Sequence, residues 1–228
     1  MPAHGHDHPV AVVVGAGPGI GTAMAVRYAT AGYRTIGIAR SDASLTALRA
    51  AGAAHGVDLG TATADAGNPA ELTAALEQIA AAHGPIRSAL YNAADLSRGR
   101  MRDVTGEQLA ASLAVNVVGA QAMIQALRGP MAEAGGGTIL LTGGGLALAP
   151  SPVFGPLSIG KAALRALTLV AARDLDRQGI HLATLTIQGF VAEDGDIAPA
   201  RAAEALWALH EQTRDGGWDV ERTLDAGG

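Results

Sequence analysis

The chain has 228 residues, of which 49% are hydrophobic, 16% are charged and only 3% are aromatic, which suits one well-buried domain. The formal net charge is −5 and no segment is strongly basic, so nucleic acid is not an expected partner. The chain has no cysteine, which excludes disulfides, thiol catalysis and Cys-ligated metal. Neither a secretory leader nor an apolar run of membrane-spanning length is apparent, so we expect a soluble, cytoplasmic protein with no membrane partner.

Residues 1–9 contain His4, His6 and His8 at alternate positions. Imidazoles are common metal ligands, so this spacing would allow a metal site. The simpler interpretation is a polar tail that binds metal only adventitiously. We therefore predict a flexible tail over residues 1–9, a single domain over residues 10–228, and no functional metal site.

From residue 10 onward, short apolar runs alternate with helix-forming segments. The first run, residues 10–14, is continuous, which is typical of a strand buried on both faces. Asn68, Pro69 and Glu71 together form a strong helix start. Strands are predicted over residues 10–14, 35–39, 61–64, 86–91, 138–141 and 181–187, with a further edge strand over 218–224. Helices are predicted over residues 20–31, 42–51, 68–83, 105–128, 158–178 and 200–210.

Strands and helices alternate without a polar linker or an internal repeat. Because connections between parallel strands are right-handed, this order predicts an α/β fold in which a doubly wound parallel sheet carries helices on both faces. In such sheets a ligand binds at the carboxyl ends of the strands, near the point where the strand order reverses.

A glycine-rich turn separates the first predicted strand from its helix. One glycine allows a tight turn, a second lets the backbone approach a pyrophosphate, and a third brings the helix close to the strand. The pyrophosphate then lies against the helix N-terminus, where free N–H groups favour negative charge. We therefore predict a single-domain Rossmann-type fold. Its dinucleotide-binding residues are Gly15, Gly17, Gly19, Ile20 and Gly21.

The end of the second strand indicates which dinucleotide is bound. An acidic residue there would bind the ribose 2′-hydroxyl of NAD(H), whereas an arginine suits the 2′-phosphate of NADP(H). This chain has Arg40 at that place and no carboxylate before Asp42. We therefore expect NADP(H) as the cofactor, with NAD(H) the less favoured alternative.

With these features in place, the sequence resembles the short-chain dehydrogenase/reductase family over nearly its whole length. The family's Gly-x-x-x-Gly-Ile-Gly turn is matched by residues 15–21. The resemblance implies two further cofactor contacts, from Asp65 after the third strand and from Asn92 after the fourth. It also implies catalytic roles for Asn116 and Lys161, of which the lysine additionally holds the cofactor ribose.

The catalytic positions depart from the family pattern. The family's Tyr-x-x-x-Lys pair would require a tyrosine where this chain has Leu157, and its partner serine falls on Gly144. The family's proline-glycine pair beside the nicotinamide is replaced by Gln188 and Gly189, so only Gly189 carries over as a cofactor contact. The remaining proton-donor candidates are Ser158, Thr142, a water held by Asn116 and Lys161, or a group on the substrate.

The leading interpretation is an atypical NADP(H)-dependent oxidoreductase that acts on a small organic substrate, namely a carbonyl compound, an imine or a conjugated acceptor. A positioned acid or base contributes about 10²- to 10⁴-fold, so hydride transfer could persist without the tyrosine. One alternative is a catalytically inactive NADP(H)-binding sensor or structural protein. Another is a non-redox cyclase, isomerase or lyase, which the glycine run 143–145 favours by opening space near the reaction centre.

Two features suggest how the chain assembles. The Ala-rich helices around Gln121 and Leu167 resemble those through which the family forms dimers and tetramers. The resemblance therefore implies a homodimer or homotetramer. Only residues 190–199 separate Gly189 from the last predicted helix, which suggests an open or shallow substrate site.

Overall fold

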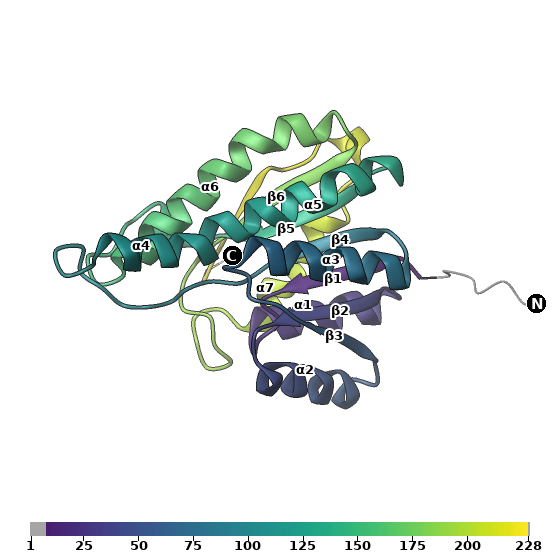
Figure 1. The fold of residues 1–228 in the computed structure, drawn as a ribbon, viewed down its shortest axis with the longest axis horizontal. Helices are drawn as coiled ribbons and strands as arrows, with labels where there is room; N and C mark the ends of the chain where they lie inside the picture. The colour runs from purple at the N-terminus through teal and green to yellow at the C-terminus, as the bar shows by residue number, and fades with distance from the viewer. Residues whose placement is uncertain (1–7, 228) are drawn as a thin grey trace, which may run out of the picture.

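The computed structural model describes residues 8–227 (Figure 1). Its seven strands form one sheet in the order β3-β2-β1-β4-β5-β6-β7, and every neighbouring pair is parallel. The strands are β1 (Val10–Val14), β2 (Arg34–Ala39), β3 (Leu59–Thr63), β4 (Ile86–Tyr91), β5 (Gly137–Thr142), β6 (Ile180–Gln188) and β7 (Glu221–Asp225). The strand order reverses between β1 and β4, so the predicted doubly wound α/β sheet is confirmed.

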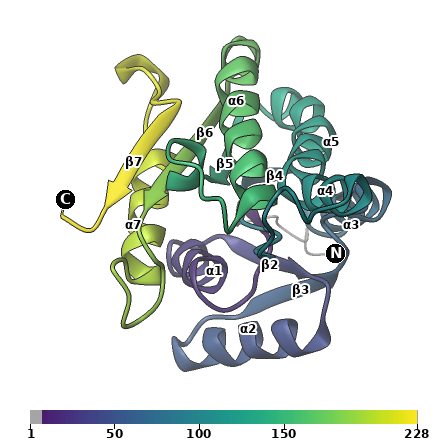
Figure 2. The same cartoon turned by 90° about the vertical axis from the view of Figure 1, so that its left-hand side faces the viewer.

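Helices cover both faces of this sheet (Figure 2). One face carries α1 (Ile20–Thr30), α2 (Asp42–Ala54) and α7 (Pro199–His210). The other carries α3 (Pro69–His83), α4 (Gly106–Leu113), the π-helical turn η1 (Ala114–Val118), α5 (Gly119–Glu133) and α6 (Gly155–Asp176). Two short 3₁₀ turns, η2 (Gly145–Ala147) and η3 (Arg214–Gly216), complete the described secondary structure.

Strand β1 lies at the centre of the sheet and is buried along its whole length. Val10, Val12 and Val14 pack into the core on the α3–α5–α6 face, while Ala11 and Val13 pack into the core on the α1–α2–α7 face. A strand that alternates between two cores must be apolar at every position, which is why its sequence is a continuous apolar run.

The helix predicted from residue 105 to 128 runs further and is interrupted. Thr105 and Gln108 form the capping box that starts α4, and α5 ends at Glu133. Between them η1 widens the helix by one π turn. Helix α6 begins at Gly155, three residues before the predicted start, because Pro156 is tolerated in a first helical turn.

The continuous helical stretch Gly106–Glu133 is long and apolar enough to cross a membrane by length and composition, and an 18-residue window within it has a mean hydropathy of 1.4. This finding differs from the expectation that the chain has no apolar run of membrane-spanning length, because polar and small residues are spread through the stretch. In the structure Met123, Ile124 and Leu127 pack into the core beneath the sheet. These contacts bury one face of the stretch, and 33% of its apolar window is buried inside the described structure.

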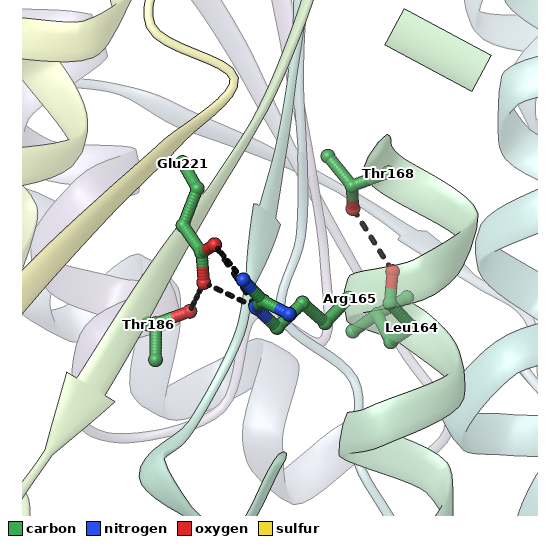
Figure 3. A network of polar contacts seen from close by, with 5 residues as sticks. All are labelled: Leu164, Arg165, Thr168, Thr186 and Glu221. Carbon is green, nitrogen blue, oxygen red and sulfur yellow. Dashed lines mark hydrogen bonds and ion pairs between the residues drawn. The ribbon is translucent and has the colours of Figure 1, made fainter. Parts of the chain in front are cut away.

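The polar edge of β7 is tied to its neighbours by one charged cluster (Figure 3). The Nε–H of Arg165 in α6 is shared between the two carboxylate oxygens of Glu221, at 2.8 and 2.9 Å, and Nη2 donates to one of them at 2.7 Å. Thr186 of β6 donates to the same carboxylate at 2.6 Å. The cluster therefore joins α6, β6 and β7, and Arg165 holds the pKa of Glu221 below its usual range.

The predicted tail over residues 1–9 is described only at its last two residues. His4 and His6 lie outside the described residues, so the metal and tail predictions for them remain predictions. His8 Nδ1 is 2.9 Å from the carbonyl oxygen of Gly32. Within residues 8–227, no group of three or more His, Cys, Asp or Glu side chains is arranged to hold a metal ion.

Candidate functional site

The glycine turn lies between the carboxyl end of β1 and the start of α1. Gly19 precedes the helix with φ = 98°, a conformation that favours glycine, and no side chain caps the helix N-terminus. A Cβ on Gly21 would lie 2.3 Å from the carbonyl oxygen of Gly15, so only glycine allows this close approach of helix and strand. The uncapped helix start and the open backbone of the turn fit a pyrophosphate group.

A cavity of about 280 Å³ adjoins the turn at the carboxyl ends of β1, β2 and β4. Asp65 is held there by the Gly67 N–H, which donates to its carboxylate at 2.9 Å. In the described part of the chain, no hydrogen bond or ion pair holds the Arg40 guanidinium. The predicted contacts that line this cavity are Gly15, Gly17, Arg40, Asp65 and Asn92, together with Ser41 and Ser44.

Asn92 joins three segments below this cavity. Its Nδ2 donates to the Gly15 carbonyl at 2.9 Å, and its Oδ1 accepts a hydrogen bond from the Thr142 hydroxyl at 3.0 Å. Both ends of the amide therefore contact protein, and Asn92 fixes the glycine turn to the ends of β4 and β5. This geometry gives Asn92 a positioning role beside the cofactor site.

A second cavity, of about 460 Å³, lies at the carboxyl ends of β5 and β6. Lys161 of α6 reaches into it with only 8% of its surface exposed. Its Nζ donates to the Thr142 carbonyl at 2.6 Å, and burial lowers the pKa of the lysine to about 8. The other polar or predicted lining residues are Ile20, Thr142, Gln188 and Gly189.

Two positions beside Lys161 carry no polar group. Leu157, one helical turn before the lysine, is buried and lines the same cavity. A Cβ placed on Gly144 would lie 3.7 Å from Cγ, Cδ and Cε of Lys161, so position 144 faces the lysine side chain directly. The lysine is therefore flanked by an aliphatic side chain and a bare backbone.

Asn116 lies in η1 and lines neither cavity. Its Oδ1 accepts the Asp95 N–H at 3.0 Å, and its Nδ2 donates to the Ser112 hydroxyl at 3.1 Å and to the Asp95 carbonyl at 3.4 Å. The amide thus holds the loop that follows β4 against the π turn. Its predicted catalytic role stays a prediction, and the contacts here are positioning contacts.

The chain's three tyrosines lie elsewhere in the fold. Tyr28 is fully buried, and its hydroxyl lies 2.6 Å from the Ser88 hydroxyl. Ser88 pairs with Ala11 and Thr138 towards the amino ends of the strands. Lys161 lies at the opposite, carboxyl ends of the strands. Burial raises the pKa of Tyr28, so this Tyr–Ser pair is a buried structural contact.

The other two tyrosines are engaged by their own partners. The Tyr91 hydroxyl donates to the Val115 carbonyl at 2.5 Å, and burial raises its pKa. Tyr33 lies 2.8 Å from Nε2 of His210. Neither lines the cavity that holds Lys161.

Comparison with known proteins identifies the family. The family model described as short chain dehydrogenase matches residues 9–193. The chain belongs to the short-chain dehydrogenase/reductase family. The glycine turn, the adjoining cavity and the cavity holding Lys161 lie within or directly beside the matched segment.

The individual curated relatives share about a third or less of their aligned residues with this chain. A D-threitol dehydrogenase from Mycolicibacterium smegmatis is 36% identical over 138 residues, which cover 59% of this chain and 52% of that protein. The human dehydrogenase/reductase SDR family member 4 is 28% identical over 76% of this chain and 63% of that protein. The chain thus spans between about half and two thirds of these curated relatives.

The solved structures agree in fold. A metagenomic short-chain oxidoreductase in complex with NADP superposes with a TM-score of 0.83 at 23% identity, covering 95% of this chain and 96% of that chain. At this identity the likeness shows the fold alone. It agrees with the single-domain, parallel-sheet architecture described above.

The structure brings most predicted site residues together at the carboxyl ends of the strands. One cavity brings together the glycine turn, Arg40 and Asp65, and the other brings together Ile20, Lys161 and Gly189. A third cavity, of about 770 Å³, is not predicted from the sequence and is bounded by Arg40, the loop after β4 and helix α4. Only the long spacing between β4 and α4 in the sequence hints at it.

Proposed function

We propose that the chain is an NADP(H)-dependent oxidoreductase of the short-chain dehydrogenase/reductase type that acts on a small organic carbonyl compound, imine or conjugated acceptor. We further propose that it works without the tyrosine acid/base of its family. The bound nicotinamide would supply or accept a hydride. The protein would orient substrate and cofactor, keep the site apolar, and manage the proton.

The arrangement of the two cavities carries this proposal. Ile20 belongs to the glycine turn and lines the same cavity as Lys161. A dinucleotide held at the turn would therefore place its adenine end beside Arg40 and its other end beside Lys161. Two reactants held in this way gain from proximity and orientation even where a proton donor is weak.

The preference for NADP(H) rests on Arg40. Arg40 directly follows β2 and lines the cavity that adjoins the turn, where its guanidinium would offer a 2′-phosphate a planar bidentate donor. The metagenomic structural relative binds NADP. Asp65 and Ser41 line the same cavity and would contact the adenosine half of the cofactor.

The atypical proton chemistry rests on Leu157 and Gly144. Neither side chain carries a hydroxyl, although both positions face Lys161 or its cavity. The same observation favours the second candidate, a sensor or structural protein that binds NADP(H) without turnover. Gly144 presents bare backbone to the cavity beside Lys161, which keeps the non-redox cyclase, isomerase or lyase alternative open as the third.

The first experiment is a titration with NADPH and NADH, followed in the same sample by a panel of ketones, imines and enones. We expect NADPH to bind more tightly than NADH and at least one substrate to oxidise it. Tight binding without turnover would support the sensor, and no binding of either nucleotide would overturn the proposal.

A matched pair of variants tests where the nucleotide binds. A Cβ on Gly17 would meet no atom within 4 Å, so substitution there is compatible with the fold. Gly17→Glu places a carboxylate against the pyrophosphate, and Gly17→Gln places a neutral group of the same size there. We expect the Kd for NADPH to be at least tenfold higher for the glutamate variant than for the glutamine variant.

The proposal includes the setting in which the enzyme acts. We infer a cytoplasmic homodimer or homotetramer, as the family resemblance implies. Its partner in the reaction is a small molecule, and neither nucleic acid nor a membrane is part of the proposed function.

A further inference from the structure

Lys161 is unusual in this chain because it is the single lysine. The other fifteen of the sixteen Lys and Arg residues are arginines. Arginine stays charged at every physiological pH, whereas a buried lysine readily shifts its pKa and releases a proton. A chain that otherwise uses arginine for positive charge retains its one lysine in the cavity at the ends of β5 and β6.

The two side-chain hydroxyls among the candidate proton donors, Thr142 and Ser158, are engaged elsewhere. The Thr142 hydroxyl donates to Asn92 at 3.0 Å. The Ser158 hydroxyl donates to the Phe154 carbonyl at 2.8 Å, accepts the Ser151 N–H at 3.1 Å, and does not line the cavity. Each hydroxyl has a local structural partner, so neither is free to protonate a substrate.

The Lys161 ammonium is well placed for that task. An ammonium has three N–H donors, and the Thr142 carbonyl accepts one of them at 2.6 Å. This bond fixes Nζ at the carboxyl end of β5 and leaves two N–H groups for a ligand. With glycine at 144 and leucine at 157, no polar side chain lies between Nζ and the cavity at those two positions.

The electrostatic surroundings of Lys161 are neutral. The elements packed around it contribute Thr142 from β5, glycines from the 143–145 turn, and Gln188 from β6, and the described lining contains no other charged side chain. Asp95, on the loop that packs against η1, is held by hydrogen bonds from Ser97 and lies outside this lining. Burial alone lowers the lysine pKa to about 8, which suits a general acid at neutral pH.

We propose that the Lys161 ammonium is itself the proton donor in the reduction, the task that the family gives to its tyrosine. The inference rests on the oxidoreductase function proposed above. The reduced nicotinamide would supply a hydride for the new C–H bond at the substrate carbon, and the π electron pair would move to the substrate oxygen or nitrogen. That atom takes a proton as the Nζ–H bond breaks, and the neutral amine then regains a proton from water. Oxidation of the product follows the reverse path.

The first test measures the lysine directly and does not depend on turnover. Protein made with ¹⁵N-labelled lysine contains one labelled side chain, so its signal needs no assignment. We expect it to titrate near pH 8, well below the value of about 10.4 for an exposed lysine. We expect NADPH to perturb its chemical shift as well. Titration above pH 10 would overturn the proposal.

The second test separates the proton from the charge. Lys161→Arg keeps a cation that can hold the cofactor ribose but cannot release its proton, and Lys161→Met removes both properties. We expect the arginine variant to bind NADPH within about threefold of the wild type and to lose about 10²- to 10⁴-fold in kcat. The methionine variant should lose binding as well. Wild-type kcat for reduction should fall as the pH rises through about 8.

The outcomes distinguish the two levels of inference. A wild-type protein that turns over no substrate would overturn the oxidoreductase function and this proposal together. A wild type that turns over, with Lys161→Arg equally active, would overturn only the proton-donor role. The double variant Lys161→Arg/Leu157→Tyr supplies a phenol one helical turn away from the arginine. Partial recovery of its activity would support the proposal, because the phenol could donate the proton that arginine cannot release.

Discussion

At the scale of single residues, Arg40 is predicted to choose the cofactor. A hydrogen bond to a charged group contributes about 1.5 to 3 kcal/mol, or about 10- to 100-fold in Kd. Arg40→Ala should therefore raise the Kd for NADPH by at least tenfold and leave that for NADH nearly unchanged, as measured by nicotinamide fluorescence. Arg128→Ala, at an exposed site on α5, is the control. Equal losses for both nucleotides would contradict the assignment.

His210 is predicted to make stability depend on pH. Its ring packs against Trp207 and Tyr28, and its Nε2 lies 2.8 Å from the Tyr33 hydroxyl. Burial lowers its pKa to about 4. Between that value and about 6.5, the unfolded chain binds a proton that the folded protein does not. As far as it depends on His210, the free energy of unfolding is therefore highest above pH 6.5. It falls by up to about 3 kcal/mol as the pH drops towards 4.

Urea unfolding at pH 7 and pH 5 measures this loss. In His210→Asn the difference in the free energy of unfolding between pH 7 and pH 5 should shrink. It should not vanish, because burial also lowers the pKa of His181. His55→Asn, at an exposed position after α2, should behave like the wild type. An unchanged pH dependence in His210→Asn would refute the prediction.

At the scale of elements, the cluster around Glu221 is predicted to fix β7 to the sheet. The Glu221 side chain is only 18% exposed, and Arg165 contacts it in bidentate fashion (Figure 3). Glu221→Ala leaves Arg165 and Thr186 without their acceptor, so we expect it to lower the free energy of unfolding by about 1 to 3 kcal/mol. Asp174→Ala breaks the exposed ion pair to Arg177 and should cost less than about 0.5 kcal/mol.

A double variant checks the cause of that loss. Replacing both partners, in Arg165→Met/Glu221→Met, leaves no unpaired charge. It should therefore destabilise the protein less than the sum of the two single substitutions. Chemical denaturation of the four proteins measures the coupling, and strictly additive costs would mean that the contact contributes nothing to the stability of β7.

At the scale of the whole molecule, local patterns predict the fold much better than the site. The apolar run of β1 and the cap at Asn68 depend on neighbouring residues, and both elements form where the sequence predicts them. The π turn η1 has no such signature, because its residues suit an ordinary helix equally well. The bonds that Thr142 makes to Asn92 and Lys161 join residues 50 and 19 positions apart, and no local pattern predicts such pairings.

Assembly is the property of the whole chain that we predict from the family resemblance. Helices α5 and α6 lie side by side on one face (Figure 1). There Val170 of α6 is 76% exposed and Val118, just before α5, is 47% exposed. An exposed apolar side chain at a two-fold interface is buried twice in each dimer. Replacing it with a charged residue therefore buries two charges in each dimer. We expect this to weaken the free energy of association by several kcal/mol.

Sedimentation velocity over a range of concentrations tests this prediction. We expect the wild type to sediment as a dimer or tetramer and Val170→Glu to shift towards monomer, with at least a 100-fold increase in the dissociation constant. Leu96→Glu, at a 68% exposed apolar position on the loop after β4, adds the same charge outside α5 and α6 and should leave the assembly intact. A wild type that is monomeric at every concentration would refute the prediction. An oligomer disrupted only by Leu96→Glu would move the interface to the loop after β4.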